Sequence, residues 1–258
     1  MIDKKLKKEF IDMKQIFKVL MLLGFVVTAY AATVEQQGEE ILDQADREFY
    51  PFEGTMEMYV QSVQSDGSKQ EYRMQVYKKG AINQTVVWTF PKINENDIGM
   101  RSGDTIYYKP RKATKPDIMS YQALFMSTGF SWGDVMSSDI ALDYKAEKVE
   151  KVKENGKDCF FLQLKPVKEG LYARIDTWID QTTFDCYKRV YYTASGDKLK
   201  IATYSEIKKE NGVVASFRVD MEDYFQETKS YAIISNIKKE KLQRFLFDPQ
   251  NIGRIHMR

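Results

Sequence analysis

Residues 54–91 read GTMEMYVQSVQSDGSKQEYRMQVYKKGAINQTVVWTFP, and this stretch decides the fold class. Apolar and polar residues alternate in three runs, which Ser65-Asp66-Gly67-Ser68 and Lys79-Gly80 separate. Alternation with a period of two is typical of β-strands that bury one face, and glycine-containing turns between such runs indicate antiparallel hairpins. The first strand starts the pattern with Met56, Met58 and Val60 on one face and Glu57 on the other.

Further runs of this kind follow as far as residue 237. We expect strands at 105–109, 160–164, 173–179, 187–192, 199–207, 213–221 and 232–237. About nine to eleven antiparallel strands are therefore predicted in all. A sheet of this size must close, or nearly close, to protect its edges. We predict a mainly β (α+β) fold, an incomplete antiparallel β-barrel with helices covering its concave apolar face.

Helical patterns flank and interrupt the expected strands. Thr33-Val34-Glu35-Gln36 is a capping box, and apolar residues at helical spacing follow it as far as Tyr50-Pro51. Tyr121–Met126 predicts another helix, and a second capping box, Ser131-Trp132-Gly133-Asp134, opens a further short helix. A last short helix is expected around Lys241–Phe247.

The first 31 residues have the three parts of a secretory signal peptide. Lysines precede an apolar run from Val19 to Val27, and Ala29-Tyr30-Ala31 is an A-x-A cleavage site. The run is shorter than a membrane-spanning helix requires, and an uncleaved anchor is the alternative. Met13 is an alternative start to Met1, because a tidier signal begins there. We predict a signal peptide at 1–31, cut near Ala31, and one domain at 32–258 exported to a bacterial periplasm.

Charge and composition exclude several classes of function. The 258 residues carry a net charge of +2, and 13% of them are aromatic. Without residues 1–31, 33 basic and 34 acidic residues remain, so the charge gives no reason to expect a nucleic acid or other anionic partner. The single imidazole is His256, close to the end of the chain, and zinc, phosphate-loop and dinucleotide motifs are absent. We therefore expect no catalytic residue, no metal and no cofactor.

Three local patterns leave alternatives open. Asp176 and Asp180 share one face of an expected strand and could serve glycoside hydrolysis, although a solvated outer face is favoured. Cys159 and Cys186 could form a disulfide after export, but they begin strands about 10 Å apart, beyond the reach of about 7 Å. The run Tyr187–Tyr192 is basic and aromatic, and we interpret it as a strand with an exposed polar face.

Apolar side chains that converge on the inside of the curled sheet are the candidate binding residues. Methionine adapts to varied apolar ligands, and a half-closed barrel with an apolar lining suits an acyl chain. An ordinary packed core is the alternative for each residue. The predicted cavity and lid consist of Met56, Met58, Met74, Val76, Val86, Trp88, Phe90, Tyr108, Phe125, Met126, Phe130, Trp132, Phe217, Val219 and Met221.

Five stretches resemble the LolA-like family of outer-membrane lipoprotein-sorting proteins: Thr89-Phe90-Pro91, Gly99–Pro110, Phe125–Val135, Tyr172–Asp180 and Tyr191–Lys200. The resemblance covers about residues 33–250. The tryptophan usual in the second stretch is replaced around Ile106–Tyr108, and the spacing at Gly129-Phe130 is tighter than in the family. The resemblance implies an incomplete barrel with a helical lid over an apolar cavity.

The resemblance and the apolar pattern together predict a periplasmic carrier. It would shuttle acyl chains of lipoproteins or lipids between the inner and outer membranes, with an inner-membrane transporter as donor and an outer-membrane acceptor. One alternative is an envelope sensor or adaptor of the same fold that does not transport. Another is an envelope enzyme that uses acidic residues.

Overall fold

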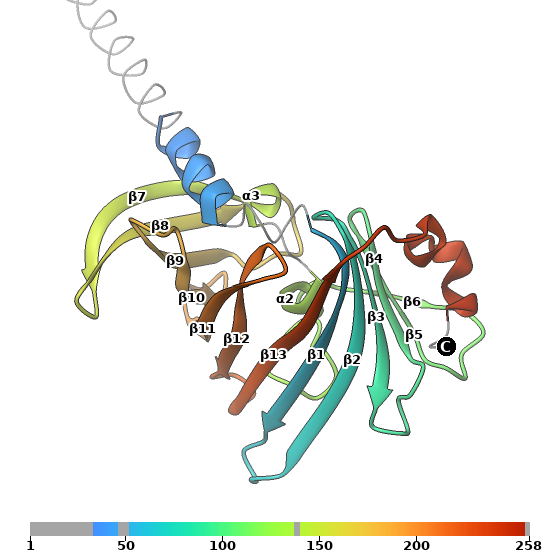
Figure 1. The fold of residues 1–258 in the computed structure, drawn as a ribbon. Helices are drawn as coiled ribbons and strands as arrows, with labels where there is room; N and C mark the ends of the chain where they lie inside the picture. Colours follow the sequence, from blue (N-terminus) through green and yellow to red (C-terminus); the bar gives the residue numbers. More distant parts are fainter. Residues whose placement is uncertain (1–32, 46–51, 137–139, 256–258) are drawn as a thin grey trace, which may run out of the picture.

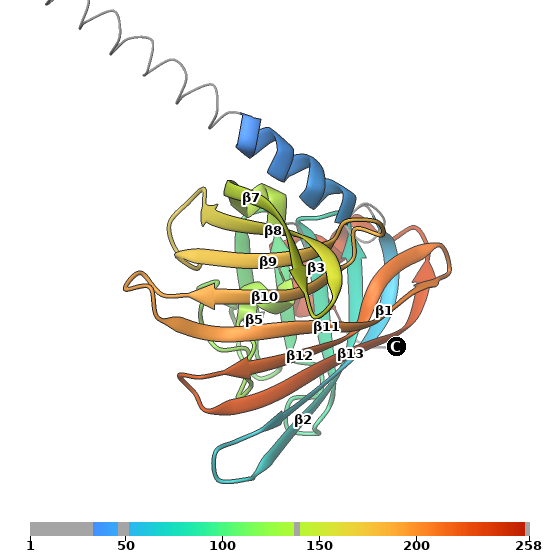
Figure 2. The ribbon, with the colours of Figure 1, turned by 90° about the vertical axis from the view of Figure 1, so that its left-hand side faces the viewer.

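The computed structural model describes residues 33–45, 52–136 and 140–255. The expectations for the signal peptide, for the helix beyond residue 45 and for His256 lie outside these residues. The described strands form one antiparallel sheet of 13 strands in the order β6-β5-β4-β3-β2-β1-β13-β12-β11-β10-β9-β8-β7. The sheet curls without closing, so that its two halves face one another across a concave interior (Figures 1 and 2). The predicted mainly β, incomplete barrel is confirmed.

The sheet consists of two meanders that join where β1 pairs with β13. The first meander contains β1 (Glu53–Val63), β2 (Lys69–Lys79), β3 (Asn83–Phe90), β4 (Ile98–Ser102), β5 (Thr105–Lys109) and β6 (Asp117–Met119). The second contains β7 (Tyr144–Glu154), β8 (Lys157–Pro166), β9 (Arg174–Asp180), β10 (Cys186–Tyr192), β11 (Lys198–Glu210), β12 (Val213–Asp223) and β13 (Thr228–Lys239).

The expected count of nine to eleven strands is too low, because three strands lack a clear alternation. Strand β4 is buried on both faces, so that its apolar residues do not alternate with polar ones. Strand β6 has only three residues. Strand β7 lies at the other edge of the sheet and is rich in lysine and glutamate, which is how edge strands avoid pairing with other chains.

The helix at residues 33–45 lies against the β7 edge (Figure 2). It buries Ile41 and Leu42, which agrees with the predicted helical spacing. A Cβ added at Gly38 would lie only 2.2 Å from the Cβ of Ala146 in β7, so glycine permits the close approach of helix and strand. The Nζ of Lys145 lies 3.4 Å from a carboxylate oxygen of Glu39 and adds a surface ion pair.

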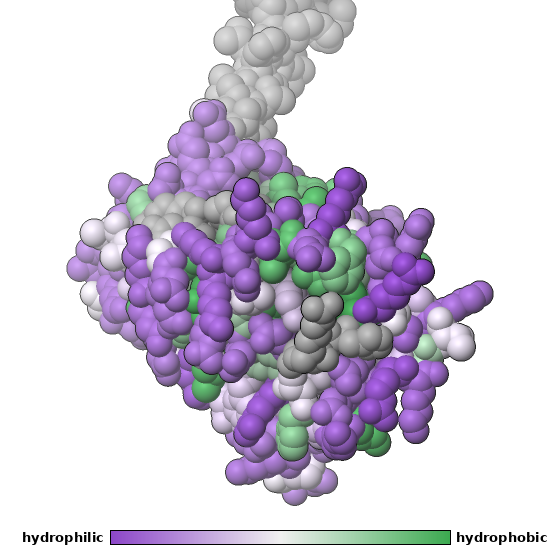
Figure 3. All heavy atoms as spheres, turned by 45° about the vertical axis from the view of Figure 1, so that its right-hand side comes forward, coloured by the Kyte–Doolittle hydropathy of each residue, from purple (hydrophilic) through white to green (hydrophobic). Residues whose placement is uncertain are grey.

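The two C-terminal 3-10 helices, η1 (Arg244–Phe247) and η2 (Pro249–Arg254), cover the convex face and not the concave one as expected. A small second core forms there from Val87, Ile98, Met100, Ile252 and Ile255. This core explains why β3 and β4 are buried on both faces. The face of the molecule in Figure 3 is mainly hydrophilic, with hydrophobic side chains in small separate areas.

A segment at residues 120–136, called here the crossing segment, leads from the β6 edge across the concave face towards β7. It contains α2 (Trp132–Met136), and α3 (Ile140–Asp143) follows it (Figure 1). The predicted capping box at α2 is confirmed. The backbone N–H of Ser131 donates to Oδ2 of Asp134 at 2.7 Å, and the N–H of Asp134 donates to Oγ of Ser131 at 3.1 Å.

The helix predicted at Tyr121–Met126 is wrong. Its backbone instead pairs with the next few residues, because Phe125 N–H donates to the Phe130 carbonyl at 2.8 Å and Trp132 N–H to the Ala123 carbonyl at 2.9 Å. Met126 has a φ of 56°, which no α-helix accommodates. Packing of the aromatic side chains on the sheet therefore overrides the local helical propensity.

Candidate functional site

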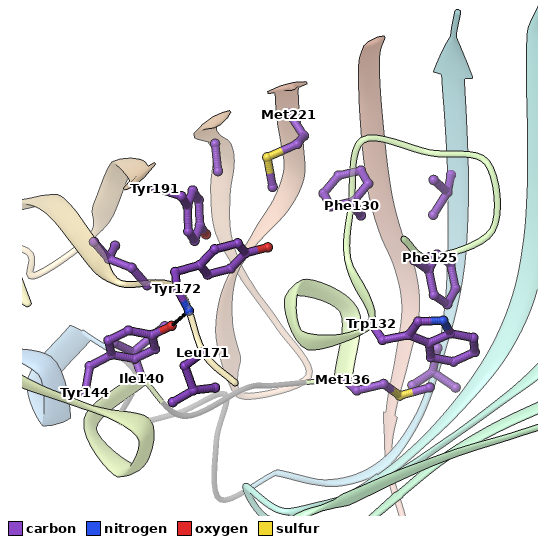
Figure 4. Packing of buried hydrophobic residues seen from close by; sticks show 14 of the residues in the cluster. Phe125, Phe130, Trp132, Met136, Ile140, Tyr144, Leu171, Tyr172, Tyr191 and Met221 are labelled. Atoms are coloured by element: carbon purple, nitrogen blue, oxygen red, sulfur yellow. Dashed lines mark hydrogen bonds between the residues drawn. The ribbon is translucent and has the colours of Figure 1, made fainter. Parts of the chain in front are cut away.

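A cavity of about 230 Å³ lies between the concave face and the crossing segment. Strands β1, β2 and β9 to β13 supply most of its wall. The crossing segment, α3 and residues 171–172 supply most of the rest, and the lining is completed by Ala45, Gln84, Tyr144 and Asp185. Figure 4 shows buried residues on both sides of this interior, with Phe130 and Met221 on one side and Tyr172 and Tyr191 on the other.

Seven of the fifteen residues predicted for the cavity and lid are at its wall: Met56, Met58, Val76, Phe130, Phe217, Val219 and Met221. Together with Ala232 and Ile234 of β13 they form a continuous apolar wall, called here the methionine wall. Apart from Phe130, which comes from the crossing segment, it lies where the two meanders join, since β1, β2, β12 and β13 are neighbours in the sheet.

Four other predicted residues, Trp88, Tyr108, Phe125 and Trp132, form a packed aromatic cluster instead of a wall. The rings of Trp88 and Phe125 stack with centroids 5.4 Å apart, and Phe125 meets Trp132 edge-on at 5.0 Å. The ring centroids of Tyr108 and Trp132 lie 5.2 Å apart. The crossing segment therefore fills the concave face over β3 and β5 with its own side chains, and the cavity occupies only the remaining part.

The last four predicted residues do not line the cavity either. Met74 and Val86 are buried in the core, and Met126 is half-buried against it. Phe90 is 42% exposed, so the expectation that it faces the interior is wrong. The pairing of β2 with β3 shifts after Trp88, and this irregularity places Phe90 opposite Arg73, whose guanidinium lies 5.6 Å from the ring centroid.

Beside the methionine wall, from the point where Tyr204 of β11 pairs with Val219 of β12, lies a polar part of the lining that the sequence did not reveal. It consists of Tyr144, Tyr172, Arg189, Tyr191 and Tyr204, and is called here the tyrosine wall. Across the β9–β10 pairing, Arg189 is opposite Thr177 and Tyr191 is opposite Ile175. Directly opposed residues share a face, so both side chains point inwards with Ile175. The interpretation of Tyr187–Tyr192 as an exposed polar face is therefore wrong for these two residues.

Burial raises the pKa of the phenols in the tyrosine wall. It raises the pKa of Tyr204 to about 12, although the nearby Arg189 charge acts in the opposite direction. Burial likewise raises the pKa of Tyr144, Tyr172 and Tyr191 above the ordinary value. At neutral pH these side chains are therefore hydroxyl donors and acceptors, and the Tyr144 hydroxyl accepts from the Tyr172 backbone N–H at 2.9 Å (Figure 4).

A buried ionic network holds the crossing segment to the second meander. The Nζ of Lys200 lies 3.1 Å from Oδ2 of Asp134 and 3.9 Å from Oδ2 of Asp223, and it donates to the Gly129 carbonyl at 3.1 Å. The Tyr172 hydroxyl lies 3.1 Å from both carboxylate oxygens of Asp134. Because these charged side chains are nearly inaccessible to water, each depends on the others for compensation.

Contacts with the first meander hold the other side of the crossing segment. The Gln84 side chain donates to the Val135 carbonyl at 2.9 Å, and Arg101 donates to the Met136 carbonyl at 3.3 Å. In α3, which follows the crossing segment, Oδ2 of Asp143 lies 4.0 Å from Nη2 of Arg101. The crossing segment is thus attached to both halves of the sheet and closes the cavity from one side.

We expect Gly99→Ala to disturb the packing of the crossing segment against β4. A Cβ at position 99 would lie 2.7 Å from Cε of Met136 and 2.8 Å from Cζ3 of Trp132. Because the Trp132 ring is held by its aromatic neighbours, the free energy of unfolding should fall by about 1–3 kcal/mol, measured by urea denaturation. Gly253→Ala is the matched control, since its Cβ would meet only the Lys109 side chain at 3.4 Å. Equal losses in the two variants would contradict the prediction.

The carboxylate pair considered for glycoside hydrolysis lies outside the cavity. Asp176 alternates with Ile175 and Thr177 and faces the convex side, where Oδ1 lies 3.1 Å from Nε of Arg174. It is buried by this ion pair and not solvated as expected. Asp180 accepts from the backbone N–H groups of Thr182 and Thr183, which help to hold its pKa below the ordinary value against the effect of burial.

Cys159 and Cys186 are not joined by a disulfide. Within the described ranges, no group of three or more His, Cys, Asp or Glu side chains is placed to hold a metal ion. None of the helices in the described part of the chain combines the length and apolar character needed to cross a membrane.

Comparison with known proteins places the fold. A family model described as "Uncharacterized protein" matches residues 99–254, and no curated protein matches the sequence. A LolA superfamily protein from Nitrosomonas europaea is similar in structure, with a TM-score of 0.75 and 22% identity over 82% of this chain and 97% of that one. A DUF1329 family protein from Desulfovibrio piger has a TM-score of 0.75 and 17% identity, covering 85% and 99%.

A domain from Vibrio parahaemolyticus, named for outer membrane lipoprotein sorting, has a TM-score of 0.73 and 16% identity, covering 85% of this chain and 100% of that one. Identities this low are evidence for a shared fold and not for a shared ligand. The model match, by contrast, spans more than half of the chain. The chain therefore belongs to the family of uncharacterized proteins defined by that model, and its fold is that of the LolA superfamily.

Proposed function

We propose that this protein is a periplasmic carrier that binds acyl chains of lipoproteins or lipids in the cavity beneath the crossing segment. The observation that carries the proposal is the methionine wall. Met56, Met58 and Met221 are unbranched and adaptable, and with Phe217 and Val219 they offer an apolar surface to a flexible chain. Each methylene group that leaves water for such a surface contributes about 0.8 kcal/mol, so that binding needs no catalytic residue.

The fold and the sequence support the rest of the proposal. A solved domain of the same fold is named for outer membrane lipoprotein sorting. The predicted signal peptide at 1–31 would deliver the mature chain to the periplasm. There an inner-membrane transporter would act as donor and an outer-membrane protein as acceptor. The crossing segment would serve as the lid, because it lines one side of the cavity and is attached to both meanders by side-chain contacts.

The first test measures acyl ligands directly. The mature chain, residues 32–258, is purified without detergent, and its organic extract is examined by mass spectrometry. The same protein is loaded with the neutral dye N-phenyl-1-naphthylamine, and dodecanol and dodecanoate are added as competitors. We expect acyl species in the extract and displacement of the dye. An extract free of acyl species, together with no displacement by either competitor, would refute the proposal.

A second test distinguishes a carrier from a sensor or adaptor of the same fold. Donor vesicles containing a fluorescent phospholipid are mixed with unlabelled acceptor vesicles, with and without the protein. A carrier should raise the rate of lipid transfer in proportion to its concentration. A protein that binds acyl ligands but leaves this rate unchanged would favour the sensor.

A further inference from the structure

The cavity has two chemically different walls, and this difference has a consequence for the ligand. The methionine wall is apolar, whereas the tyrosine wall carries four phenols and one guanidinium. A hydrocarbon chain alone would make no hydrogen bond to the phenols and the guanidinium of the second wall. An amphiphile with a polar head would use both.

Arg189 is the main cation of the tyrosine wall. It is 8% exposed, its Nη1 donates to the Tyr204 hydroxyl at 3.1 Å, and its guanidinium lies 5.1 Å from the Tyr204 ring centroid. The phenol of Tyr204 thus positions the guanidinium at the cavity wall. Arginine loses less hydration on burial than lysine, and its planar fork of donors matches a carboxylate or a phosphate.

Two of the three acidic side chains at the cavity wall have a close cation. Asp134 is compensated by Lys200 at 3.1 Å, and Asp143 by Lys168 at 3.0 Å. Asp185 accepts from the hydroxyl of Thr183 at 2.7 Å. Each of these three carboxylates therefore has a close polar contact in the structure.

We propose that Arg189 and the neighbouring tyrosines bind the anionic head, a carboxylate or a phosphate, of an amphiphile whose chain lies along the methionine wall. This proposal rests on the proposed function for the binding of the acyl chain, and it adds the chemical class of the ligand's head. The tyrosine hydroxyls stay protonated at neutral pH, so they donate to the oxygens that the guanidinium leaves uncovered. The structure thus assigns a head-group site to β10 and β11.

The test compares ligands with the same chain and different heads. Dodecanoate, dodecyl phosphate and dodecanol are titrated against the protein loaded with N-phenyl-1-naphthylamine, first with the wild type and then with Arg189→Met. We expect the two anionic ligands to bind the wild type at least about tenfold more tightly than dodecanol. In Arg189→Met this preference should disappear, while dodecanol binds within about twofold of the wild type.

Two control variants make the result specific. Arg218→Met removes an arginine from the convex face of β12, where it pairs with Asp220 at 2.6 Å, and should leave every affinity unchanged. Arg189→Lys keeps the charge but loses the fork, and should retain part of the preference. Sodium acetate and inorganic phosphate, which have no chain, should not displace the dye at the concentrations at which the amphiphiles do.

The outcomes separate this proposal from the one it rests on. Equal affinities of the wild type for dodecanoate and dodecanol would overturn the head-group site and leave the acyl carrier standing. The same holds if Arg189→Met weakens all three ligands equally. Tight binding of acetate or phosphate alone would show a site for free anions. It would overturn the proposal that the ligand is an amphiphile. Displacement by none of the ligands would overturn the carrier itself. The wild-type comparison decides the question even if a variant fails to fold.

Discussion

Replacement of Lys200 by methionine is expected to lower the free energy of unfolding by about 3–5 kcal/mol. The loss follows from the position of the ammonium group between the carboxylates of Asp134 and Asp223, all three of which are nearly inaccessible to water. Methionine fills a similar volume, but it leaves two buried negative charges without their shared cation. Urea denaturation followed by circular dichroism measures the loss.

A surface ion pair provides the comparison. Lys188 lies 2.9 Å from Glu154, and both side chains are about one-third exposed, so Lys188→Met should cost less than about 1 kcal/mol. The double variant Lys200→Met with Asp134→Asn should recover part of the stability, because one uncompensated charge is removed with the cation. A loss at position 200 no larger than the loss at position 188 would show that the network does not hold the crossing segment in place.

Ala232→Trp is expected to lower the affinity for N-phenyl-1-naphthylamine and for dodecanol by more than about tenfold while the protein stays folded. Ala232 belongs to the methionine wall, and its side chain points into the cavity of about 230 Å³. An indole at this position occupies the space that the ligand needs. Because the new side chain enters space that is not densely packed, the stability should change far less than in an ordinary core substitution.

The next residue along β13 is the matched control. Ile233 points to the opposite face of the sheet, since neighbouring residues of a strand alternate. Ile233→Trp should therefore leave the affinities unchanged, and the melting temperatures of the two variants should be similar. If Ala232→Trp binds the dye as tightly as the wild type, the cavity described here is not the binding site.

Local patterns were enough to predict the type of most elements. Alternation located β1 to β3, β5 and β8 to β13. Each of these strands presents one face to a core, while its other face is exposed or less deeply buried. Alternation does not reveal β4 and β7, for opposite reasons. One is covered on both faces, and the other is a charged edge strand. In both cases burial depends on what packs against the strand, which local sequence does not contain.

The same limit applies to the site. Alternation correctly predicted that Met56, Met58, Phe217 and Met221 face the interior. It could not show that Trp88 would be covered by aromatic rings from the crossing segment. It also could not show that Arg189 faces inwards, because the orientation of β10 depends on its register with Ile175 and Thr177 of β9.

The sequence by itself determined the mainly β class, the cap of α2 and the apolar character of one face of the sheet, because these depend on residues a few positions apart. It also pointed to the LolA fold through five short stretches. Only the tertiary structure decided how the concave face is divided into a packed aromatic cluster, a methionine wall and a tyrosine wall. That division depends on the path of the crossing segment and on the strand register, which bring together residues as distant as Gly129 and Ser230, joined by a 2.9 Å hydrogen bond.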